Sequence, residues 1–272
     1  IYKMALSNNV IGIINFIAVL LSIPIIGAGI WLTTLQAESC VKILQWPVII
    51  LGILIFIVAM VGLVGAFWRI PMLLIFYLIA MIVLIVLLVS LVIFVYFVTL
   101  RGHGNIEPNR SYLEYHVNDF SIWLRRRVRS SHKWDGIKSC LSSSSICAEL
   151  NQSYRLPQDF FNAHLSPLQS GCCKPPTKCG YTFVNPTYWI SPINNGEDMD
   201  CMKWSNDQTQ LCYNCDSCKA GLLATLRIDW RKANVILIVT LVGLIVVYLF
   251  GCFAFRNAKT EELFRKYKQG YT

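Results

Sequence analysis

The sequence predicts an all-α membrane protein, in which a four-helix transmembrane bundle carries a disulfide-rich, mainly helical large extracellular loop. Three observations support this fold class. The chain of 272 residues is 55% hydrophobic and only 14% charged, whereas soluble domains are about a quarter charged. Four long segments contain no charged residue, and ten of the eleven cysteines lie outside those segments. The membrane, rather than one soluble core, therefore organises the chain.

Each uncharged segment is long enough to cross a bilayer as a helix, which takes roughly 20 residues. The predicted spans are residues 10–32, 46–67, 71–100 and 233–255. A cleaved signal peptide is the alternative for the first segment. Its apolar stretch exceeds the usual core of roughly 7–15 residues, however, and Trp31 stands where a small residue would precede cleavage. We therefore predict four spans.

The distribution of basic residues predicts the orientation of these spans. The spans leave an N-tail (1–9), a small loop (33–45), a three-residue loop (68–70), a large loop (101–232) and a C-tail (256–272). Seven Lys and Arg residues lie in the two tails and the three-residue loop, against one in the small loop. Short segments rich in Lys and Arg stay in the cytoplasm. Both termini are therefore predicted to be cytoplasmic, and the net charge of +9 indicates topology rather than a nucleic-acid partner.

The cysteines follow this topology. Ten lie in the two predicted extracellular loops: Cys40, Cys140, Cys147, Cys172, Cys173, Cys179, Cys201, Cys212, Cys215 and Cys218. Because that compartment is oxidising, disulfides are favoured. A zinc site at Cys212, Cys215 and Cys218 is the alternative, but no histidine accompanies them. Ten cysteines allow five bridges, one of them tying the small loop to the large loop, with a leftover free thiol as the competing interpretation.

Small and polar residues recur along the first two spans at seven-residue intervals, which keeps one seam facing a partner helix. They are Asn15, Ser22 and Gly29 on the first span, and Gly52, Ala59 and Ala66 on the second. In lipid, such residues mark helix contacts. We interpret them as an antiparallel packing seam between spans one and two.

The large loop is predicted to hold helices near residues 112–128, 134–141, 158–168 and 215–230, with an irregular loop at 184–200. The exposed aromatics Tyr188 and Trp189 are candidate partner contacts, with core packing as the alternative for either. Asn109 and Asn151 begin glycosylation sequons. The five basic residues of 123–133 could meet acidic polysaccharide or lipid headgroups, but a solvated helix face is preferred.

No catalytic or cofactor-binding motif is present in the sequence, so we expect neither an enzyme nor a cofactor. A pore or transporter is disfavoured because the four predicted spans contain no ionisable Asp, Glu, Lys, Arg or His. Claudin-like junction proteins carry the larger loop first, whereas here it is second. A receptor for a soluble extracellular ligand remains open.

Three motifs resemble the tetraspanin family. An adjacent cysteine pair follows a glycine in GCCKPP at 171–176, where the animal pattern reads CCG. Together with CYNCDSCKAG at 212–221 and SNNVIGIINF at 7–16, it is similar to the plant branch. The resemblance covers essentially the whole chain, including the number of spans and the order of the small and large loops.

This resemblance implies a non-enzymatic membrane scaffold that organises partner membrane proteins into lateral assemblies, in plant cell signalling or development. It implies self-association with other tetraspanins and contact with membrane lipids. Sterol is a further candidate because residues 91–101 match a weak cholesterol-contact pattern around Tyr96. The implied location is the plasma membrane, with endosomes or secreted vesicles as further sites. Cys252, near the cytoplasmic end of span four, is the expected S-palmitoylation site.

The resemblance also implies a disulfide pairing, since the adjacent cysteines of the family bond to cysteines further along the same loop. Carried over, Cys172 is expected to pair with Cys215 or Cys218. Cys173 is expected to pair with an intermediate cysteine such as Cys201.

Overall fold

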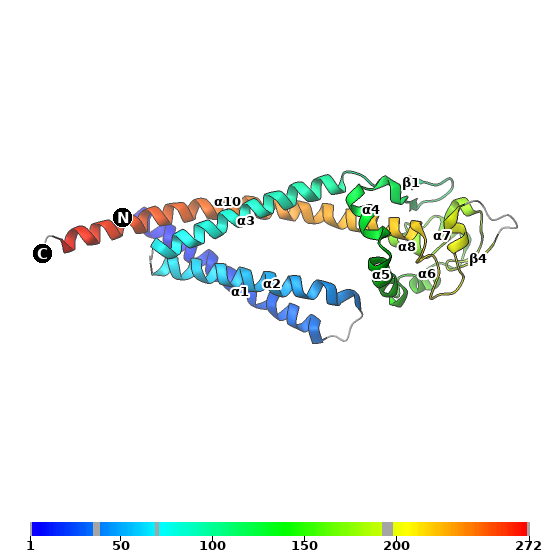
Figure 1. Ribbon diagram of the computed structural model, residues 1–272, viewed down its shortest axis with the longest axis horizontal. Helices are drawn as coiled ribbons and strands as arrows, with labels where there is room; N and C mark the ends of the chain where they lie inside the picture. Colours follow the sequence, from blue (N-terminus) through cyan, green and yellow to red (C-terminus); the bar gives the residue numbers. More distant parts are fainter. Residues whose placement is uncertain (1, 35–38, 69–70, 192–197, 271–272) are drawn as a thin grey trace. The chain divides into compact units, whose positions relative to one another are not determined.

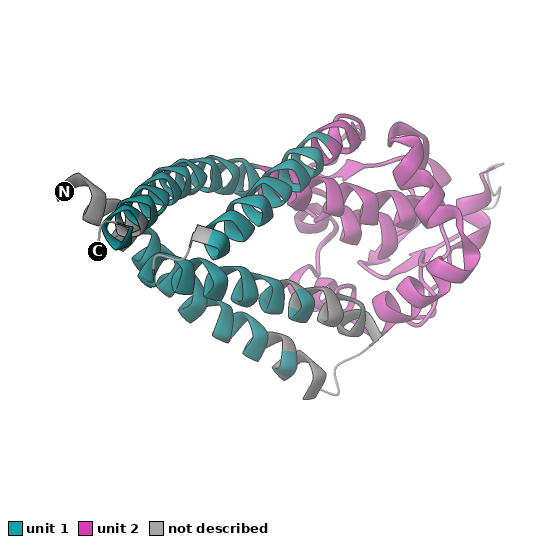
Figure 2. Ribbon diagram, turned by 60° about the vertical axis from the view of Figure 1, so that its left-hand side comes forward, with its two compact units in different colours: residues 1–37, 41–93, 235–272 teal, residues 38–40, 94–234 magenta. Residues whose placement is uncertain are grey.

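The computed structural model describes residues 2–34, 39–68, 71–191 and 198–270, although some side chains within these ranges, Cys40 among them, are not described. The chain forms two compact units, coloured separately in Figure 2. The membrane unit comprises residues 1–37, 41–93 and 235–272, and the loop unit comprises residues 38–40 and 94–234. Two long helices, α3 and α10, contribute residues to both units.

Long apolar helices make up the membrane unit (Figure 1). They are α1 (Tyr2–Thr34), α2 (Ser39–Phe67), α3 (Pro71–Thr99) and α10 (Asp216–Gln269). Among the described residues, α1, α3 and α10 are each long and apolar enough to cross a membrane, and α2 adds a shorter apolar stretch, Gly52–Phe67. The predicted helix 215–230, the fourth predicted span and most of the C-tail form one continuous helix. The span boundaries stay predictions.

Small residues allow α1 and α2 to approach closely. A Cβ atom added at Gly52 would lie 2.8 Å from the Ile26 side chain, and one added at Gly62 would lie 2.6 Å from the Asn15 carboxamide oxygen. The buried Asn15 donates hydrogen bonds to the Ile11 carbonyl at 2.9 Å and to the Tyr77 hydroxyl of α3 at 3.4 Å. Asn15 therefore connects three helices, not only the two that the heptad pattern indicated.

The other predicted seam residues are also buried where they are described. Ser22 and Ala59 are buried, and Ala66 packs in a small cluster with Ile11 of α1 and Ala254 of α10. The surroundings of Gly29 lie outside the described residues.

Short elements fill the loop unit between α3 and α10. Its helices are α4 (Ile122–Arg129), α5 (Ser131–Ser143), α6 (Ala148–Ser153), α7 (Pro157–Phe161), α8 (Pro167–Cys172) and α9 (Met199–Lys203), with 3-10 turns at Val117–Asp119 and Thr177–Cys179. Two antiparallel hairpins pair β1 (Asn105–Ile106) with β2 (Leu113–Glu114), and β3 (Thr182–Asn185) with β4 (Tyr188–Ile190).

Three sequence predictions for this unit are wrong in part. The expected irregular loop 184–200 includes the end of β3, all of β4 and the start of α9. The expected helix 112–128 begins only at Ile122, because residues before it form β2 and a 3-10 turn. The expected helix 158–168 is interrupted between α7 and α8. Ser166 accepts a hydrogen bond from the Gln169 amide in a capping box and Pro167 opens the new helix, both of which are helix-start signals.

An aromatic cluster forms part of the core of the loop unit. Phe160 is fully buried, and its ring centroid lies 5.3 Å from that of Phe183. Trp189 meets Phe183 edge-on at 5.1 Å and donates its indole hydrogen to the Pro186 carbonyl. Only 5% of Trp189 is exposed. The prediction that Trp189 is an exposed partner contact is therefore wrong, because β4 turns this side chain into the core.

Two glycines let α8 lie directly against the start of α10. A Cβ atom added at Gly171 would lie 2.3 Å from the Ser217 carbonyl oxygen, and one at Gly221 would lie 2.3 Å from the Pro167 carbonyl oxygen. Since both obstacles are backbone atoms, no side-chain rotation could relieve the clash. This close approach positions the cysteine pair beside α10.

Candidate functional site

The adjacent cysteines Cys172 and Cys173 bond to opposite parts of the loop unit. Cys172, the last residue of α8, bonds to Cys218 in the first turn of α10, which is one of its two expected partners. Cys173 bonds to Cys147, immediately before α6. The expected partner Cys201 was wrong, because Cys201 bonds to Cys179 instead. We call residues 171–176, with these two bridges, the hub.

The remaining cystines brace segments next to the hub. Cys179 bonds to Cys201, and Cys212 bonds to Cys215. With Cys212, Cys215 and Cys218 all in disulfides, a zinc site there is contradicted. Cys140 is also disulfide-bonded. The predicted bridge from Cys40 to the large loop falls outside the described side chains and stays a prediction.

A largely buried charge pair joins the hub to β2. Only 1% of the Lys174 side chain is exposed, and its ammonium group contacts the Glu114 carboxylate of β2 directly. Lys174 also donates to the Pro175 carbonyl at 3.2 Å and lies 4.6 Å from the Tyr112 ring centroid. The Thr177 hydroxyl and amide donate to Glu114 at 2.6 and 3.1 Å. The Thr177 amide also lies 3.3 Å from the second carboxylate oxygen, so each oxygen of this partly buried carboxylate has a donor.

The groups around Glu114 lower the pKa of its carboxyl group. Burial acts to raise the pKa of its carboxyl group, but Lys174 and the Thr177 donors outweigh burial and lower that pKa below its ordinary value of 4.5. A depressed folded-state pKa contributes stability above the unfolded-state pKa, and this contribution is lost as the pH falls through the folded-state value. Burial, in turn, raises the pKa of the neighbouring Tyr112 to about 12, so its ring faces Lys174 as a neutral phenol.

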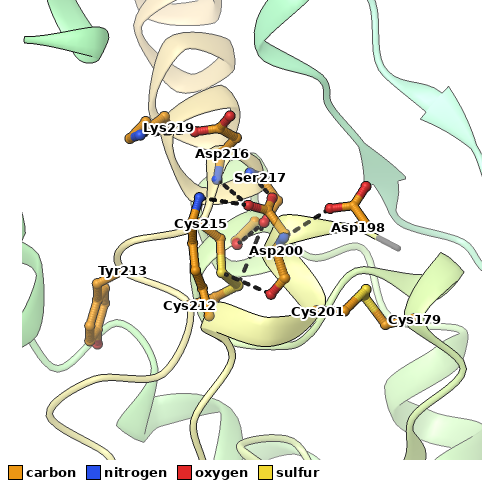
Figure 3. A network of polar contacts seen from close by, with 12 residues as sticks. Cys179, Asp198, Asp200, Cys201, Cys212, Tyr213, Cys215, Asp216, Ser217 and Lys219 are labelled. Atoms are coloured by element: carbon orange, nitrogen blue, oxygen red, sulfur yellow. Dashed lines mark hydrogen bonds and ion pairs between the residues drawn. A yellow bond between two sulfur atoms is a disulfide. The ribbon is translucent and has the colours of Figure 1, made fainter. Parts of the chain in front are cut away.

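A second carboxylate, Asp200 of α9, caps the N-terminus of α10 (Figure 3). It accepts hydrogen bonds from the backbone amides of Asp216 and Ser217, each at 2.8 Å. Free amides at a helix start carry partial positive charge, so a carboxylate there stabilises the helix by roughly 0.3–1 kcal/mol, and up to about 2 when partly buried. The Ser217 hydroxyl also donates to the Gly171 carbonyl at 3.1 Å, which joins the cap to the hub.

The β3–β4 hairpin presents an apolar face away from the core. Successive residues of a strand point to opposite sides, so Trp189 packs inward while Tyr188 and Ile190 are 48% and 55% exposed. The side chain of Asn206 bonds to both the amide and the carbonyl of Trp189 at 3.0 Å. We call Val184, Tyr188 and Ile190 the hairpin face; all three are exposed.

The turn of this hairpin is anchored as well. Thr187 is fully buried and its hydroxyl oxygen accepts hydrogen bonds from Asn151 at 2.7 Å and from Gln208 at 3.0 Å. The turn is therefore fixed from two directions. A fixed apolar surface loses less conformational entropy on binding than a mobile one.

The predicted modification sites are exposed or partly exposed residues. Asn109, in left-handed conformation with φ of 58°, and Asn151 are both exposed. Cys252 is a free, partly buried thiol on α10. Their modification stays a prediction.

Several residues that shape this site were missed by the sequence analysis. Glu114, Asp200 and Asn206 each act on segments distant in the chain, so no local spacing marks them. Lys174 carries a weak signal, because it lies between two cysteines and two prolines, in a segment that disulfides and proline rings restrain.

The class of protein follows from these features: a helical membrane protein whose large loop is folded around disulfides. A family model described as "Tetraspanin family" matches residues 7–257. The chain is 68% identical over 269 residues to "Protein TORNADO 2" of Arabidopsis thaliana, covering 99% of this chain and 100% of that protein. It is 52% identical over 269 residues to Tetraspanin-2 of the same plant, covering 98% and 100%. The chain therefore belongs to the tetraspanin family. No solved structure matched it.

Proposed function

We propose that this tetraspanin is a non-enzymatic scaffold of the plasma membrane that gathers partner membrane proteins into lateral assemblies in plant cell signalling or development. Both termini lie in the cytoplasm, and the large loop faces outward. The transmembrane helices associate with other tetraspanins and with membrane lipids, sterol included. The observation that carries the proposal is the hairpin face, an exposed apolar surface on an anchored hairpin.

The chemistry of the hairpin face suits recognition of another protein. Tyrosine is enriched among residues that dominate binding energy, because its ring buries a large area with few rotatable bonds. Tyr188 and Ile190 lie two residues apart on β4 and share its outward side, so a partner could cover both side chains together. Main-chain bonds to Asn206 and the anchored Thr187 hold the hairpin face in shape.

Replacing Tyr188 and Ile190 together by serine should reduce co-capture of partner membrane proteins in mild detergent by about tenfold or more. Interface anchors are each worth about 2 kcal/mol, and 1.4 kcal/mol is tenfold in affinity. The matched control is Ile106→Ser, an exposed apolar residue on the other hairpin. Surface labelling and non-reducing mobility should stay unchanged in both variants.

Equal co-capture by wild type and the Tyr188/Ile190 variant would exclude the hairpin face as the partner contact. A monomeric species that conducts ions in liposomes would instead support the pore alternative. A soluble ligand that competes with co-capture would support the receptor alternative.

Cys252 should be S-palmitoylated. It is the free thiol among the described cysteines and lies near the predicted cytoplasmic end of the fourth span, where cysteines are acylated. Acyl-exchange labelling should detect about one acyl group per wild-type chain and none in Cys252→Ser. Equal labelling of the two proteins would refute this assignment, because the disulfide-bonded cysteines do not carry thioesters.

A further inference from the structure

A basic and aromatic surface on α4 and the start of α5 is not used by the hub or the hairpin face. It is an open hollow of about 500 Å³, lined by Ile122, Trp123, Arg126, Arg127 and Lys133. None of these lining residues is acidic. We call this surface the α4 patch.

The arginines of α4 divide into two groups. Arg125 and Arg129 donate to the Asn118 carboxamide oxygen at 3.4 and 3.2 Å. Arg127 and Arg126 instead border the hollow, where the Arg127 guanidinium lies 4.8 Å from the Trp123 ring centroid. Among the described residues, no ion pair joins either arginine to a carboxylate. Neighbouring like charges repel, so the α4 patch favours an anionic ligand.

Trp123 fixes the position of the α4 patch relative to the predicted spans. Its ring meets Phe94 of α3 edge-on, with centroids 5.2 Å apart at 84°. It also lies 6.2 Å from Trp230 of α10. Phe94 belongs to the predicted third span, and Trp230 comes three residues before the predicted fourth span. On the predicted boundaries, Trp123 therefore lies near the outer ends of the third and fourth spans.

The α4 patch combines cations with exposed apolar side chains, as protein surfaces at a membrane interface do. Ile122 is 57% exposed and Trp123 is 38% exposed. Tryptophan rings concentrate at the interface between hydrocarbon and headgroups, and long basic side chains reach from there toward lipid phosphates. A soluble acidic polymer would need the cations alone and would gain nothing from Ile122.

We propose that the α4 patch binds the phosphate-bearing headgroups of anionic lipids in the non-cytoplasmic leaflet. Arg126, Arg127 and Lys133 contact the phosphate, while Ile122 and Trp123 rest at the interface. Lipid binding would hold α4 and the start of α5 against the bilayer surface. This inference is separate from the proposed scaffold function, because the hairpin face could recruit partners whether or not lipid binds α4.

The test uses the purified full chain in an uncharged detergent, titrated with phosphatidylglycerol or phosphatidylcholine and followed by native mass spectrometry. Wild type is compared with Arg126→Gln/Arg127→Gln and with the control Arg125→Gln/Arg129→Gln. Both variants remove two charges from the same helix. All three proteins keep the basic C-tail, so anionic lipid bound there contributes equally to each. Differences in lipid binding among the three therefore come from α4.

We expect the Arg126/Arg127 variant to bind phosphatidylglycerol about 10- to 30-fold more weakly than wild type. The control should stay within about threefold, and phosphatidylcholine binding should not change. A second measurement needs no variant: the rate at which each lysine of the wild-type protein is acetylated in nanodiscs with and without phosphatidylglycerol. Phosphatidylglycerol should protect Lys133 about fivefold or more, and should not protect Lys138 on the same helix.

Equal loss of lipid in the two variants, or equal reactivity of Lys133 with and without phosphatidylglycerol, would overturn the proposal. Soluble polygalacturonate provides the competing arm. If it protects Lys133 while phosphatidylglycerol does not, the partner is an acidic polysaccharide and the lipid assignment is wrong.

Discussion

Cys172→Ser or Cys173→Ser should leave an inserted protein with a misfolded large loop, poor surface delivery and lost partner binding. The bridges from these cysteines close segments of 46 and 26 residues, and each contributes roughly 3–4 kcal/mol in the chain-entropy model. That is a large share of the roughly 5–15 kcal/mol that stabilises a domain. Each substitution also frees a partner thiol, Cys218 or Cys147, for mispairing. Insertion should persist because it depends on the apolar helices.

Non-reducing gel mobility, surface labelling and partner co-capture measure this outcome together. The control is Cys252→Ser, which removes a cysteine without breaking a disulfide. If both hub variants reach the surface and keep their partners, the hub does not maintain the fold of the large loop.

Glu114→Gln should destabilise the large loop by about 3–5 kcal/mol, because it leaves the buried Lys174 without a counter-charge. The double variant Glu114→Leu/Lys174→Met should lose much less, since it removes both charges and keeps similar apolar volume. Resistance of the full chain to proteolysis within the large loop, measured against temperature, gives the comparison. A double variant less stable than Glu114→Gln would show that the charge pair is not the cause.

The same pair predicts a dependence on acidity. As the pH falls from 4.5 through the lower folded-state pKa of Glu114, wild type should lose the stability that the ionised carboxylate contributes. Glu114→Gln cannot titrate at this position, so its stability should change less over the same interval. Parallel pH profiles for the two proteins would contradict the assignment of a lowered pKa to Glu114.

The sequence was sufficient to predict the helical membrane class and the disulfide bonding of the cysteine pair, because both depend on local signals. Uncharged runs of span length are visible without tertiary information. The glycine before Cys172 is part of the recognised motif, but its role comes from the structure, where a Cβ atom added there would lie 2.3 Å from the Ser217 carbonyl oxygen. The Asn15 contact was predicted as interhelical, but its partner on α3 could not be identified from a heptad pattern on α1 and α2.

The remaining features depend on residues that the chain brings together from a distance. Glu114 and Lys174 lie 60 residues apart, and neither has a local partner that would reveal the pair. Cys173 had several possible partners, because cysteine connectivity cannot be deduced from spacing alone. The β3–β4 hairpin turns at Pro186 and Thr187, in a segment where Pro and Asn suggested only an irregular loop. Its buried Thr187 depends on Asn151 and Gln208, which no turn signal indicates.

Disulfide mapping of the non-reduced full chain tests the central claim most directly, namely that two bridges diverge from adjacent cysteines to fix the large loop. Because no protease separates Cys172 from Cys173, electron-transfer fragmentation should resolve the linked peptides. The structure predicts Cys172 joined to Cys218 and Cys173 joined to Cys147. Peptides that join Cys173 to Cys201, or a free thiol at either hub cysteine, would contradict it.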